Sequence, residues 1–510
     1  MSDEATDRGR AVAPLAGATF DLLVIGGGIV GAGVARDAAS RGLRTLLLER
    51  SDFASGTSSR SSRLLHGGLR YLAQGRLGLV REASVEKMRL SRIAPHLCRP
   101  MPFLFPVWRG AGWSLWQLSL GVRLYDLLCG GRNLGRSSTL RADDVLRLVP
   151  GLRREGLEGA SRHFDALTND ARLVIDTLRS AEEAGATLRN YTTFVAGAPS
   201  GGGWACDVRD EIGGATAAVQ ARVVVSAAGA WASRLPRNGI RLRLTKGVHA
   251  VVDRHRLPVD EAIVLPEGER ILFVIPWGER TILGTTDTDY EGDPADVRTE
   301  PSDVRYILDV VNGAFPGARL GPADVISTWA GVRPLIAPRR KRAGAPSDVS
   351  RGHVIRMTEP GWFDVAGGKL TTYRRMAEQV VDRVGGFLGR RLPRSATADR
   401  PLSQGPFSGV EPPPIGSEVV AECCRREWAV HLDDVLLRRT SWHFYHPNQA
   451  EIAERTARWM AETLGWDRER QAAELDRYRE SADSPPRRAS ASDSHERGQA
   501  KMADEVGKPT

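Results

Sequence analysis

A chain of 510 residues is too long for a single hydrophobic core, so its length predicts two or three domains. Its composition, 41% hydrophobic and 26% charged, is that of an ordinary folded protein. The formal net charge of +9 fits an anionic substrate, an anionic membrane surface or a solvated basic face, and no nucleic-acid motif accompanies it, so no nucleic-acid partner is expected.

The five cysteines are scattered and form no C-x-x-C pair. This spacing argues against a zinc site or a disulfide framework and favours a reducing cytoplasm, so no metal is expected. The polar N-terminus lacks the pattern of a signal peptide, and no apolar run reaches the length of about 18 residues that a membrane span requires.

The first predicted element is the apolar strand DLLVI (21–25), which leads into the G-x-G-x-x-G pattern of Gly26, Gly28 and Gly31. The first glycine permits a tight turn, the second lets the backbone approach a pyrophosphate, and the third lets a helix pack closely on a strand. The next strand, RTLLLE, ends at Glu49, where a carboxylate can accept hydrogen bonds from a ribose. This order predicts a Rossmann-like dinucleotide site but does not separate NAD from FAD.

Three later segments favour FAD, which is long and extended. TSSRSSRLLHGGLRYL (57–72) offers hydroxyls and amides along such a cofactor, and ARVVVSAAGAWA (221–232) ends in a second close backbone approach. VAGGKLTTYRRMAE (365–378) directs a helix N-terminus and a lysine at the flavin ring, where positive potential stabilises an anionic reduced flavin. The predicted cofactor-binding residues in these segments are Thr57, Ser58, Ser59, Ser61, Ser62, His66, Gly67, Gly229, Gly368, Lys369, Leu370 and Thr371.

The apolar segment AGWSLWQLSLGVRLYDLLCGG (111–131) has two interpretations. One is a helix that lies in a membrane interface, with its tryptophans at headgroup depth and nearby arginines on anionic lipid. The other is an ordinary buried helix of the second domain.

Strand-like and helix-like runs alternate along the chain, which predicts an α/β fold with a β-rich insert and a short C-terminal helical segment. The division that we expect is a disordered tail at 1–19, a discontinuous cofactor-binding domain of 20–92, 165–233 and 326–392, a substrate-binding domain of 93–164 and 234–325, a Pro/Gly-rich linker at 400–416, a C-terminal helical domain of 417–480 and a disordered tail at 481–510.

These motifs resemble those of the FAD-dependent glycerol-3-phosphate dehydrogenases, within the D-amino-acid-oxidase-like flavoproteins. The resemblance covers roughly residues 20–390 and depends most on HGGLRYL, GTTDTDYEGDP and GGKLTTYR. It implies non-covalent FAD, although His66 raises the question of a covalent link. It further implies oxidation of sn-glycerol 3-phosphate to dihydroxyacetone phosphate, electron transfer to a membrane quinone, a homodimer, and a cytoplasmic protein at the inner face of an anionic plasma membrane.

By position, the resemblance assigns Arg70, Tyr71, Arg333 and Lys369 to the substrate site and Arg351, less directly, to a second phosphate contact. His249 of KGVHAVV matches a histidine near the flavin. Guanidinium pairs suit a phosphate dianion, and an unperturbed histidine suits the removal of a hydroxyl proton. Two alternatives stay open: an arginine or lysine stabilises a developing alkoxide in place of a histidine base, and Tyr71 serves as a lid or as core packing.

Two other functions also remain open. The first is an oxidase of the same fold that uses oxygen and acts on glycerol 3-phosphate or a small amino or hydroxy acid. The second is a flavin-binding interaction protein that lost turnover, because the C-terminal helical domain is shorter than the family's usual one. Retention of Arg70, Arg333 and Lys369 argues for an enzyme.

Overall fold

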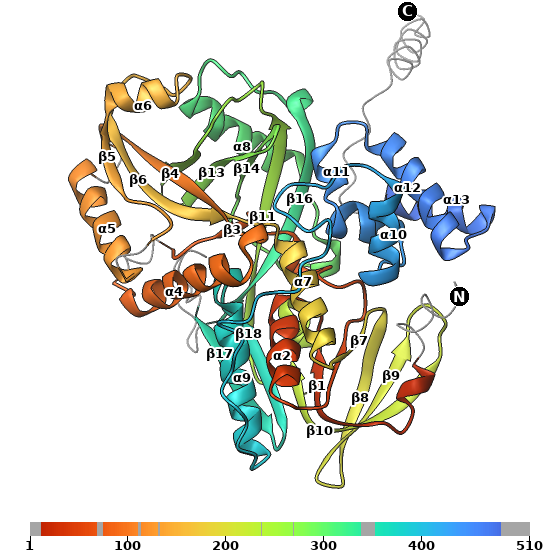
Figure 1. The fold of residues 1–510 in the computed structure, drawn as a ribbon. Helices are drawn as coiled ribbons and strands as arrows, with labels where there is room; N and C mark the ends of the chain where they lie inside the picture. The colour runs from red at the N-terminus through yellow and green to blue at the C-terminus, as the bar shows by residue number, and fades with distance from the viewer. Residues whose placement is uncertain are drawn as a thin grey trace, which may run out of the picture.

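The computed structural model describes residues 12–68, 75–110, 114–130, 133–235, 237–268, 270–337 and 352–480. Within these ranges the chain forms two β-sheets, one in the lower half of Figure 1 and one at its upper left, with a group of C-terminal helices at the upper right. The predicted α/β fold with a β-rich second part and a C-terminal helical segment is confirmed.

The first sheet has the strand order β17-β18-β10-β1-β2-β7, and β9 and β8 extend it from β10. Strands β18, β10, β1, β2 and β7 run parallel, as in a dinucleotide-binding fold. Its strands are β1 Thr19–Ile25, β2 Thr45–Leu48, β7 Thr187–Arg189, β8 Thr192–Ser200, β9 Gly203–Asp210, β10 Thr216–Ser226, β17 His353–Glu359 and β18 Trp362–Gly367.

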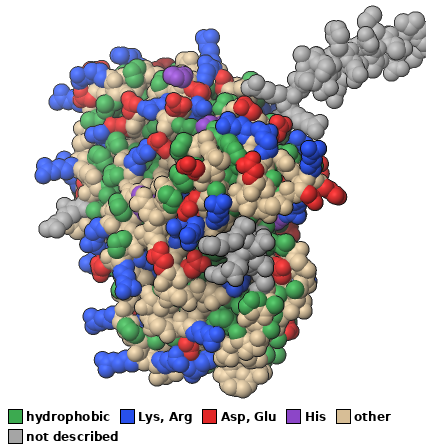
Figure 2. All heavy atoms as spheres, turned by 45° about the vertical axis from the view of Figure 1, so that its right-hand side comes forward, with side chains coloured by type: hydrophobic (Ala, Val, Ile, Leu, Met, Phe, Trp, Pro, Cys, Tyr) green, Lys and Arg blue, Asp and Glu red, His purple; other side chains and the backbone are tan. Residues whose placement is uncertain are grey.

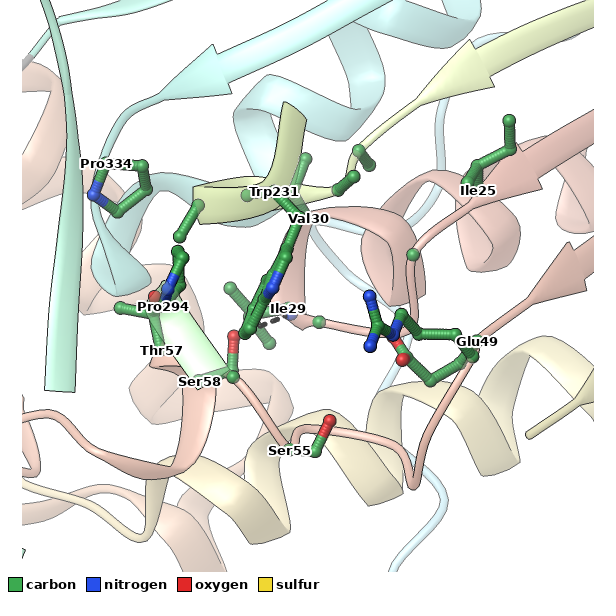
Figure 3. A pocket seen from close by; sticks show the side chains of 18 of the residues that line it. Ile25, Ile29, Val30, Glu49, Ser55, Thr57, Ser58, Trp231, Pro294 and Pro334 are labelled. Carbon is green, nitrogen blue, oxygen red and sulfur yellow. Dashed lines mark hydrogen bonds between the residues drawn. The ribbon is translucent and has the colours of Figure 1, made fainter. Parts of the chain in front are cut away.

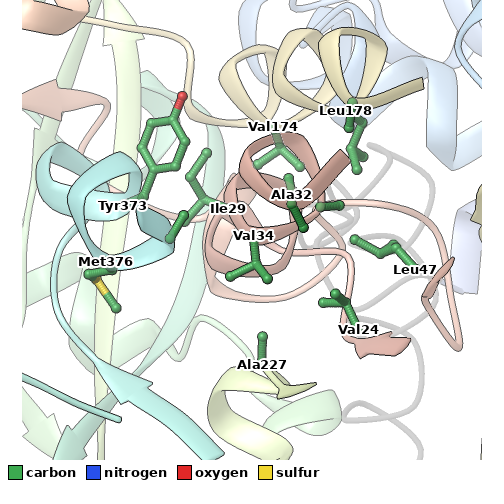
Figure 4. Close-up of a cluster of buried hydrophobic side chains, with 14 of the residues drawn as sticks. Val24, Ile29, Ala32, Val34, Leu47, Val174, Leu178, Ala227, Tyr373 and Met376 are labelled. Carbon is green, nitrogen blue, oxygen red and sulfur yellow. The ribbon is translucent and has the colours of Figure 1, made fainter. Parts of the chain in front are cut away.

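Strand β1 is continuously apolar and buried from Leu22 to Ile25, because both faces of this sheet are covered. Leu22 and Val24 face the helices, while Leu23 and Ile25 belong to the core on the other face. On the helical side, α2 packs between α7 and α9, and Figure 4 shows Val34 of α2 within this cluster. The core therefore holds the ends of β1 and β2 at fixed positions next to the N-terminus of α2.

The second sheet has the order β15-β11-β14-β13-β12-β4-β6-β3, with β16 paired to β11 and β5 to β6. Helix α8 lies on one face of it, and α11 contacts β16. Its strands are β3 Leu64–Leu65, β4 Arg99–Trp108, β5 Ser138–Arg141, β6 Leu157–Leu167, β11 Leu242–Asp253, β12 Ala262–Glu267, β13 Arg270–Trp277, β14 Arg280–Gly284, β15 Thr288–Asp289 and β16 Val325–Ile336.

The helices cover the two sheets and form the C-terminal group. The α-helices are α2 Ile29–Ser40, α4 Leu77–Ile93, α5 Leu115–Leu128, α6 Ala142–Leu148, α7 Asp170–Glu183, α8 Pro301–Ala314, α9 Tyr373–Phe387, α10 Ser417–Arg426, α11 Trp442–Tyr445, α12 Gln449–Leu464 and α13 Arg468–Glu480. The short helices are η1 Ala13–Leu15, η2 Thr57–Ser59, η3 Pro95–Leu97, η4 Gly229–Arg234, η5 Pro294–Asp296, η6 Pro322–Asp324, η8 Leu370–Thr372 and the π-helix η9 Asp434–Arg439.

The expected division into domains stays a proposal, and the strand pairing adjusts one boundary. Strand β16 pairs with β11 from Leu242↔Ile336 to Val252↔Val325, so it belongs to the second sheet, although residues 326–336 were predicted within the cofactor-binding segment 326–392. The sequence of β16 alone does not show to which sheet it belongs, because either sheet could accept such a strand. Its pairing with β11, which is distant in the sequence, determines this.

Two predicted irregular segments are also packed. Val12 and Leu15, expected in the N-terminal tail, are buried against the far face of the first sheet. The 400–416 segment has no helix or strand, as its Pro and Gly residues predict. It is nevertheless hydrogen-bonded to the rest of the protein: Ser403 N donates to Ser180 Oγ at 2.8 Å, and Pro413 O accepts from Trp442 Nε1 at 2.7 Å. Residues 1–11 and 481–510 lie outside the described residues.

Candidate active site

A cavity of about 480 Å³ lies where the carboxyl ends of β1 and β2 meet the second sheet. Figure 3 looks into it, with Glu49 on one side and Thr57, Pro294 and Pro334 on the other. Of the residues predicted to bind a cofactor, those that line this cavity are Gly26, Gly28, Glu49, Thr57, Ser58, Gly229, Gly368, Lys369 and Leu370. They come from three distant stretches of the chain.

The glycine fingerprint adopts the geometry that its spacing predicts. Gly26 has φ +109°, and a Cβ there would lie 2.7 Å from the carbonyl oxygen of Ala227. Gly31 does not line the cavity: a Cβ on it would lie 1.9 Å from Gly26 O, so its role is close packing of helix on turn. Helix α2 then begins at Ile29, and its N-cap residue Gly28 has no side chain that could cap it; Gly28 and Ile29 both line the cavity, which places the N-terminus of the helix there.

Glu49 is held in place by backbone amides. Its Oε2 accepts from Gly27 N at 2.8 Å and its Oε1 from Ser51 N at 2.9 Å. Burial raises the pKa of Glu49, and these two N–H groups counteract part of that rise. A carboxylate has about four acceptor positions, so the fixed group can still accept hydrogen bonds from ribose hydroxyls.

The hydroxylated segment after Gly56 forms most of its hydrogen bonds with other parts of the protein. Thr57 Oγ1 donates to Val332 O at 2.6 Å, and Ser58 Oγ accepts from Ile29 N at 3.0 Å, the contact drawn in Figure 3. Ser61 N donates to Asp170 at 2.9 Å and Ser62 Oγ hydrogen-bonds His249. Ser59, Ser61 and Ser62, predicted as cofactor contacts, do not line the cavity.

Three further predicted cofactor residues act behind the cavity wall. Thr371 Oγ1 accepts from His66 N at 3.1 Å and donates to His66 O at 3.2 Å, so the two segments brace one another. Gly67 N donates to Tyr125 Oη at 2.7 Å, and that hydroxyl donates to the buried carboxylate of Asp165 at 2.5 Å. His66, Gly67 and Thr371 are thus placed as supports rather than as cavity lining.

His249 lies on β11 and is 1% exposed. Its Nε2 is 2.8 Å from Ser62 Oγ, and its ring stacks on Trp329 with centroids 5.0 Å apart. The glycine at 284 makes room for it, because a Cβ there would lie 2.5 Å from the ring. Burial lowers the pKa of His249 well below its usual value, and the charges of Arg333 and Arg63 lower it further. The imidazole is therefore neutral at neutral pH, and the same effects make it a weaker base than a free imidazole.

Arg333 lies on β16, opposite Thr245 of β11, and its side chain is 22% exposed. Its Nη2 donates to Thr285 Oγ1 at 2.8 Å and its Nη1 to Asp287 Oδ1 at 3.2 Å. A Cβ on Gly247 would lie 2.2 Å from the guanidinium, so this glycine is the floor on which Arg333 lies. Gly247 and His249 are two residues apart on one strand and share a face, so the sheet brings Arg333 and His249 together.

Arg70, Tyr71 and Arg351 lie outside the described residues, so their predicted roles stay predictions. The structure adds cavity-lining residues that the sequence did not single out, chiefly Arg60, Thr192, Trp231 and Pro294. Trp231 ends the small-residue turn AAGAW after β10, and Arg60 lies within TSSRSSR, so both fall in segments that the sequence indicated as cofactor contacts. Pro294 is the last residue of GTTDTDYEGDP, a motif that carried the family resemblance but gave no sign of a contact with this cavity.

The residues of this cavity fit a flavin dinucleotide. A helix N-terminus at a glycine N-cap, a fixed acid directly after β2 and Gly-lined turns supply the contacts for a pyrophosphate and a ribose. The Gly368–Leu370 turn lies across the same cavity and brings Lys369 to it.

Comparison with known proteins agrees with this geometry. The family described as FAD dependent oxidoreductase matches residues 21–374, and the C-terminal domain of alpha-glycerophosphate oxidase matches residues 374–471. Glycerol-3-phosphate dehydrogenase 2 of Mycobacterium tuberculosis is 36% identical, over 90% of this chain and 86% of that protein. This chain belongs to the FAD-dependent glycerol-3-phosphate dehydrogenase family. The resemblance seen in the sequence is confirmed, and so is FAD as the cofactor.

Two further relatives of this family support the assignment. The aerobic glycerol-3-phosphate dehydrogenase of Staphylococcus epidermidis is 37% identical, over 76% of this chain and 72% of that protein. The X-ray structure of the glycerol-3-phosphate dehydrogenase from Bacillus halodurans, complexed with FAD, has a TM-score of 0.76 and 29% identity and covers 94% of this chain and 97% of that one.

Proposed function

We propose that this protein oxidises sn-glycerol 3-phosphate to dihydroxyacetone phosphate and passes the electrons to a membrane quinone. The names of its relatives support this substrate. The proposal depends on the placement of the neutral, buried His249 and the fixed guanidinium of Arg333 on one face of the second sheet. Arg333 belongs to β16, and its neighbours Val332 and Pro334 line the cofactor cavity.

Oxidation of a secondary alcohol removes a proton from the hydroxyl oxygen and a hydride from the carbon that carries this hydroxyl, and leaves a ketone. Bound FAD supplies the hydride acceptor, at flavin N5. His249 is the proposed base for the hydroxyl proton because its imidazole is unprotonated and lies on the strand face that also holds Arg333; its lowered pKa makes it a weak base. Arg333 binds the anionic part of the substrate or the developing alkoxide, and Lys369 adds positive potential beside the cavity. Arg70, Tyr71 and Arg351 complete the proposed substrate site.

An anaerobic titration tests the proposed substrate. Stoichiometric sn-glycerol 3-phosphate, added to the yellow holoprotein without an acceptor, is expected to bleach the visible flavin absorbance. The enantiomer and glycerol serve as controls, because neither presents the same phosphate and hydroxyl geometry. Bound FAD that no polyol phosphate bleaches would contradict the proposal and favour a flavin-binding protein without turnover. Release of hydrogen peroxide in air, without added quinone, would show that oxygen and not a quinone is the electron acceptor.

Quinone as acceptor requires a position at a membrane, and helix α5 has a surface that fits one. Its buried side carries Leu118, Val122 and Tyr125. Trp116, Leu120 and Leu127 are 68%, 61% and 70% exposed on its other side. Spacings of four and eleven residues place these three on one face of the helix. Helix α5 thus has a buried side, as an ordinary helix of the second domain has, and an exposed apolar side, which supports the membrane-interface interpretation.

We propose that this exposed face of α5 lies in the anionic inner face of the plasma membrane, which makes the protein a peripheral one. The exposed Arg123 lies between the apolar side chains and suits lipid phosphates. Within the part of the chain that the structure describes, no helix is long and apolar enough to cross a membrane. On the face of the molecule shown in Figure 2, basic and acidic side chains are interspersed.

Replacing Trp116, Leu120 and Leu127 together by serine is expected to weaken binding to phosphatidylglycerol-containing vesicles roughly tenfold or more, since a fully buried large apolar side chain contributes about 1.5–3 kcal/mol. Cosedimentation measures this. The matched control replaces the exposed Val195 and Ile212, at β8 and after β9, by serine and is expected to bind as the wild type does. Equal vesicle binding by the two variants would contradict the proposal that α5 contacts the membrane. The homodimer expected from the sequence stays a prediction.

A further inference from the structure

A buried ion-pair cluster lies directly behind one wall of the cofactor cavity. Glu49, Arg50 and Ser51 line the cavity, and the next residue, Asp52, turns away from it into the protein. Arg439 donates to Asp52 from Nη1 at 2.5 Å and from Nη2 at 2.8 Å, and Arg438 donates to it from Nε. The wall of the cofactor site is thus bonded to residues almost four hundred positions later in the chain.

The two arginines belong to η9, in the C-terminal helical segment. Arg438 also pairs with Asp433 at 2.8 Å and Asp434 at 2.5 Å, and Arg439 donates to the carbonyl of Glu427 at 2.7 Å. The side chains of Asp52 and Arg439 are fully buried. Burial by itself raises the pKa of Asp52, but Arg439 and Arg438 outweigh it and lower that pKa, so the carboxylate is charged. Removal of one partner would leave an uncompensated buried charge on the other.

The same segment holds a second wall of the cavity. Asp434 accepts a hydrogen bond from Tyr191 Oη at 2.6 Å. Tyr191 N in turn donates to Ser51 O at 2.9 Å, and Thr192 N donates to Glu49 O at 2.8 Å. Thr192 lines the cavity along with Glu49 and Ser51. Helix η9 therefore holds two segments of the cavity wall, Glu49–Ser51 and Tyr191–Thr192. In a dinucleotide-binding fold the acid at the end of the second strand contacts the adenosine ribose, so these segments belong to the adenosine end of the cavity.

We propose that Arg438 and Arg439 are positioning residues for the cofactor site, which hold the Glu49–Ser51 wall through Asp52 and so make FAD binding depend on the C-terminal helical segment. The N-terminal fingerprint supplies the contacts with the cofactor, and the C-terminal arginines supply the fixed geometry of those contacts. The proposal concerns only the FAD site and does not depend on the substrate proposed above.

The experiment measures the FAD dissociation constant of the refilled apoprotein by flavin fluorescence, together with the thermal unfolding midpoint of each apoprotein. Arg439→Lys keeps the charge but loses the two-pronged contact, and Asp52→Asn removes the charge that the arginines bind. Each is expected to weaken FAD binding at least about tenfold. The double variant is expected to lose less than the product of the two single losses, because both substitutions disrupt one contact.

The matched control is Glu427→Gln, which changes the side chain but keeps the backbone carbonyl that accepts from Arg439. Glu427 and Arg172 form a bidentate buried pair, at 2.6 and 2.7 Å, which joins α7 to the same C-terminal segment but touches no wall of the cavity. This variant is expected to lower the unfolding midpoint about as much as Arg439→Lys while its FAD dissociation constant stays within about twofold of the wild type. FAD binding that is unchanged in Arg439→Lys, or weakened equally in Glu427→Gln, would overturn the proposal. If Asp52→Asn does not fold, the FAD dissociation constant of Arg439→Lys alone tests the proposal.

Discussion

Replacing Arg333 by alanine is expected to lower kcat/KM for sn-glycerol 3-phosphate about a hundred- to a thousandfold, as loss of one fixed charge-stabilising donor does in other enzymes. The structure explains the size of the effect. Thr285 and Asp287 hold the guanidinium over Gly247, so the fork is already oriented before substrate binds and loses little freedom on binding. Stopped-flow reduction of the flavin, with varied substrate concentration, measures both the rate and the affinity.

Arg333→Lys separates charge from geometry. It keeps the positive charge but cannot bind two oxygens in one plane, so it is expected to recover only part of the lost kcat/KM. Arg256→Ala is the control, since Arg256 pairs with Asp324 on the surface and touches neither sheet face of the site. Its kcat/KM is expected to equal that of the wild type. Wild-type kinetics in Arg333→Ala, with FAD bound, would remove this residue from the substrate site.

The parts of the fold that could be predicted from the sequence are local. The strand, glycine turn and helix of 21–40 follow from contiguous residues, and so do the strand at 45–48 and its acid at Glu49, because parallel strands place their carboxyl ends at one edge. Helix α7 also has local signals, since its apolar residues recur with helical spacing and the side chain of Asn169 caps it by accepting from Arg172 N.

The parts that could not be predicted depend on contacts between distant residues. Nothing near Ser62 shows that its hydroxyl would face His249, 187 positions later, rather than a cofactor. The glycines at 247 and 284 read as ordinary strand glycines, yet they provide the space for Arg333 and His249. Likewise, the arginines at 438 and 439 resemble a surface pair in sequence and are in fact buried on Asp52.

Gly31→Ala is the second change with a large expected effect, although Gly31 touches no cofactor. Its Cβ would lie 1.9 Å from the carbonyl oxygen of Gly26, which is backbone and cannot rotate away. Either α2 or the turn at Gly26 must shift, and overpacking of this kind costs about 1–3 kcal/mol. Since that turn lines the cavity, we expect FAD binding to weaken by roughly a hundredfold. Titration of the apoprotein with FAD measures this change.

Gly121→Ala is the matched control, because Gly121 is also within a helix and has no neighbouring atom within 4 Å of an added Cβ. Alanine has the higher helix propensity, so this variant is expected to bind FAD like the wild type and to be equally or slightly more stable. Wild-type FAD affinity in Gly31→Ala would show that the turn accommodates the methyl group, and that the fingerprint holds its cofactor by contacts other than the close packing of α2 on β1. A loss confined to Gly31→Ala would instead trace cofactor affinity to that packing, because the substituted atom faces the carbonyl of Gly26 and not the cavity.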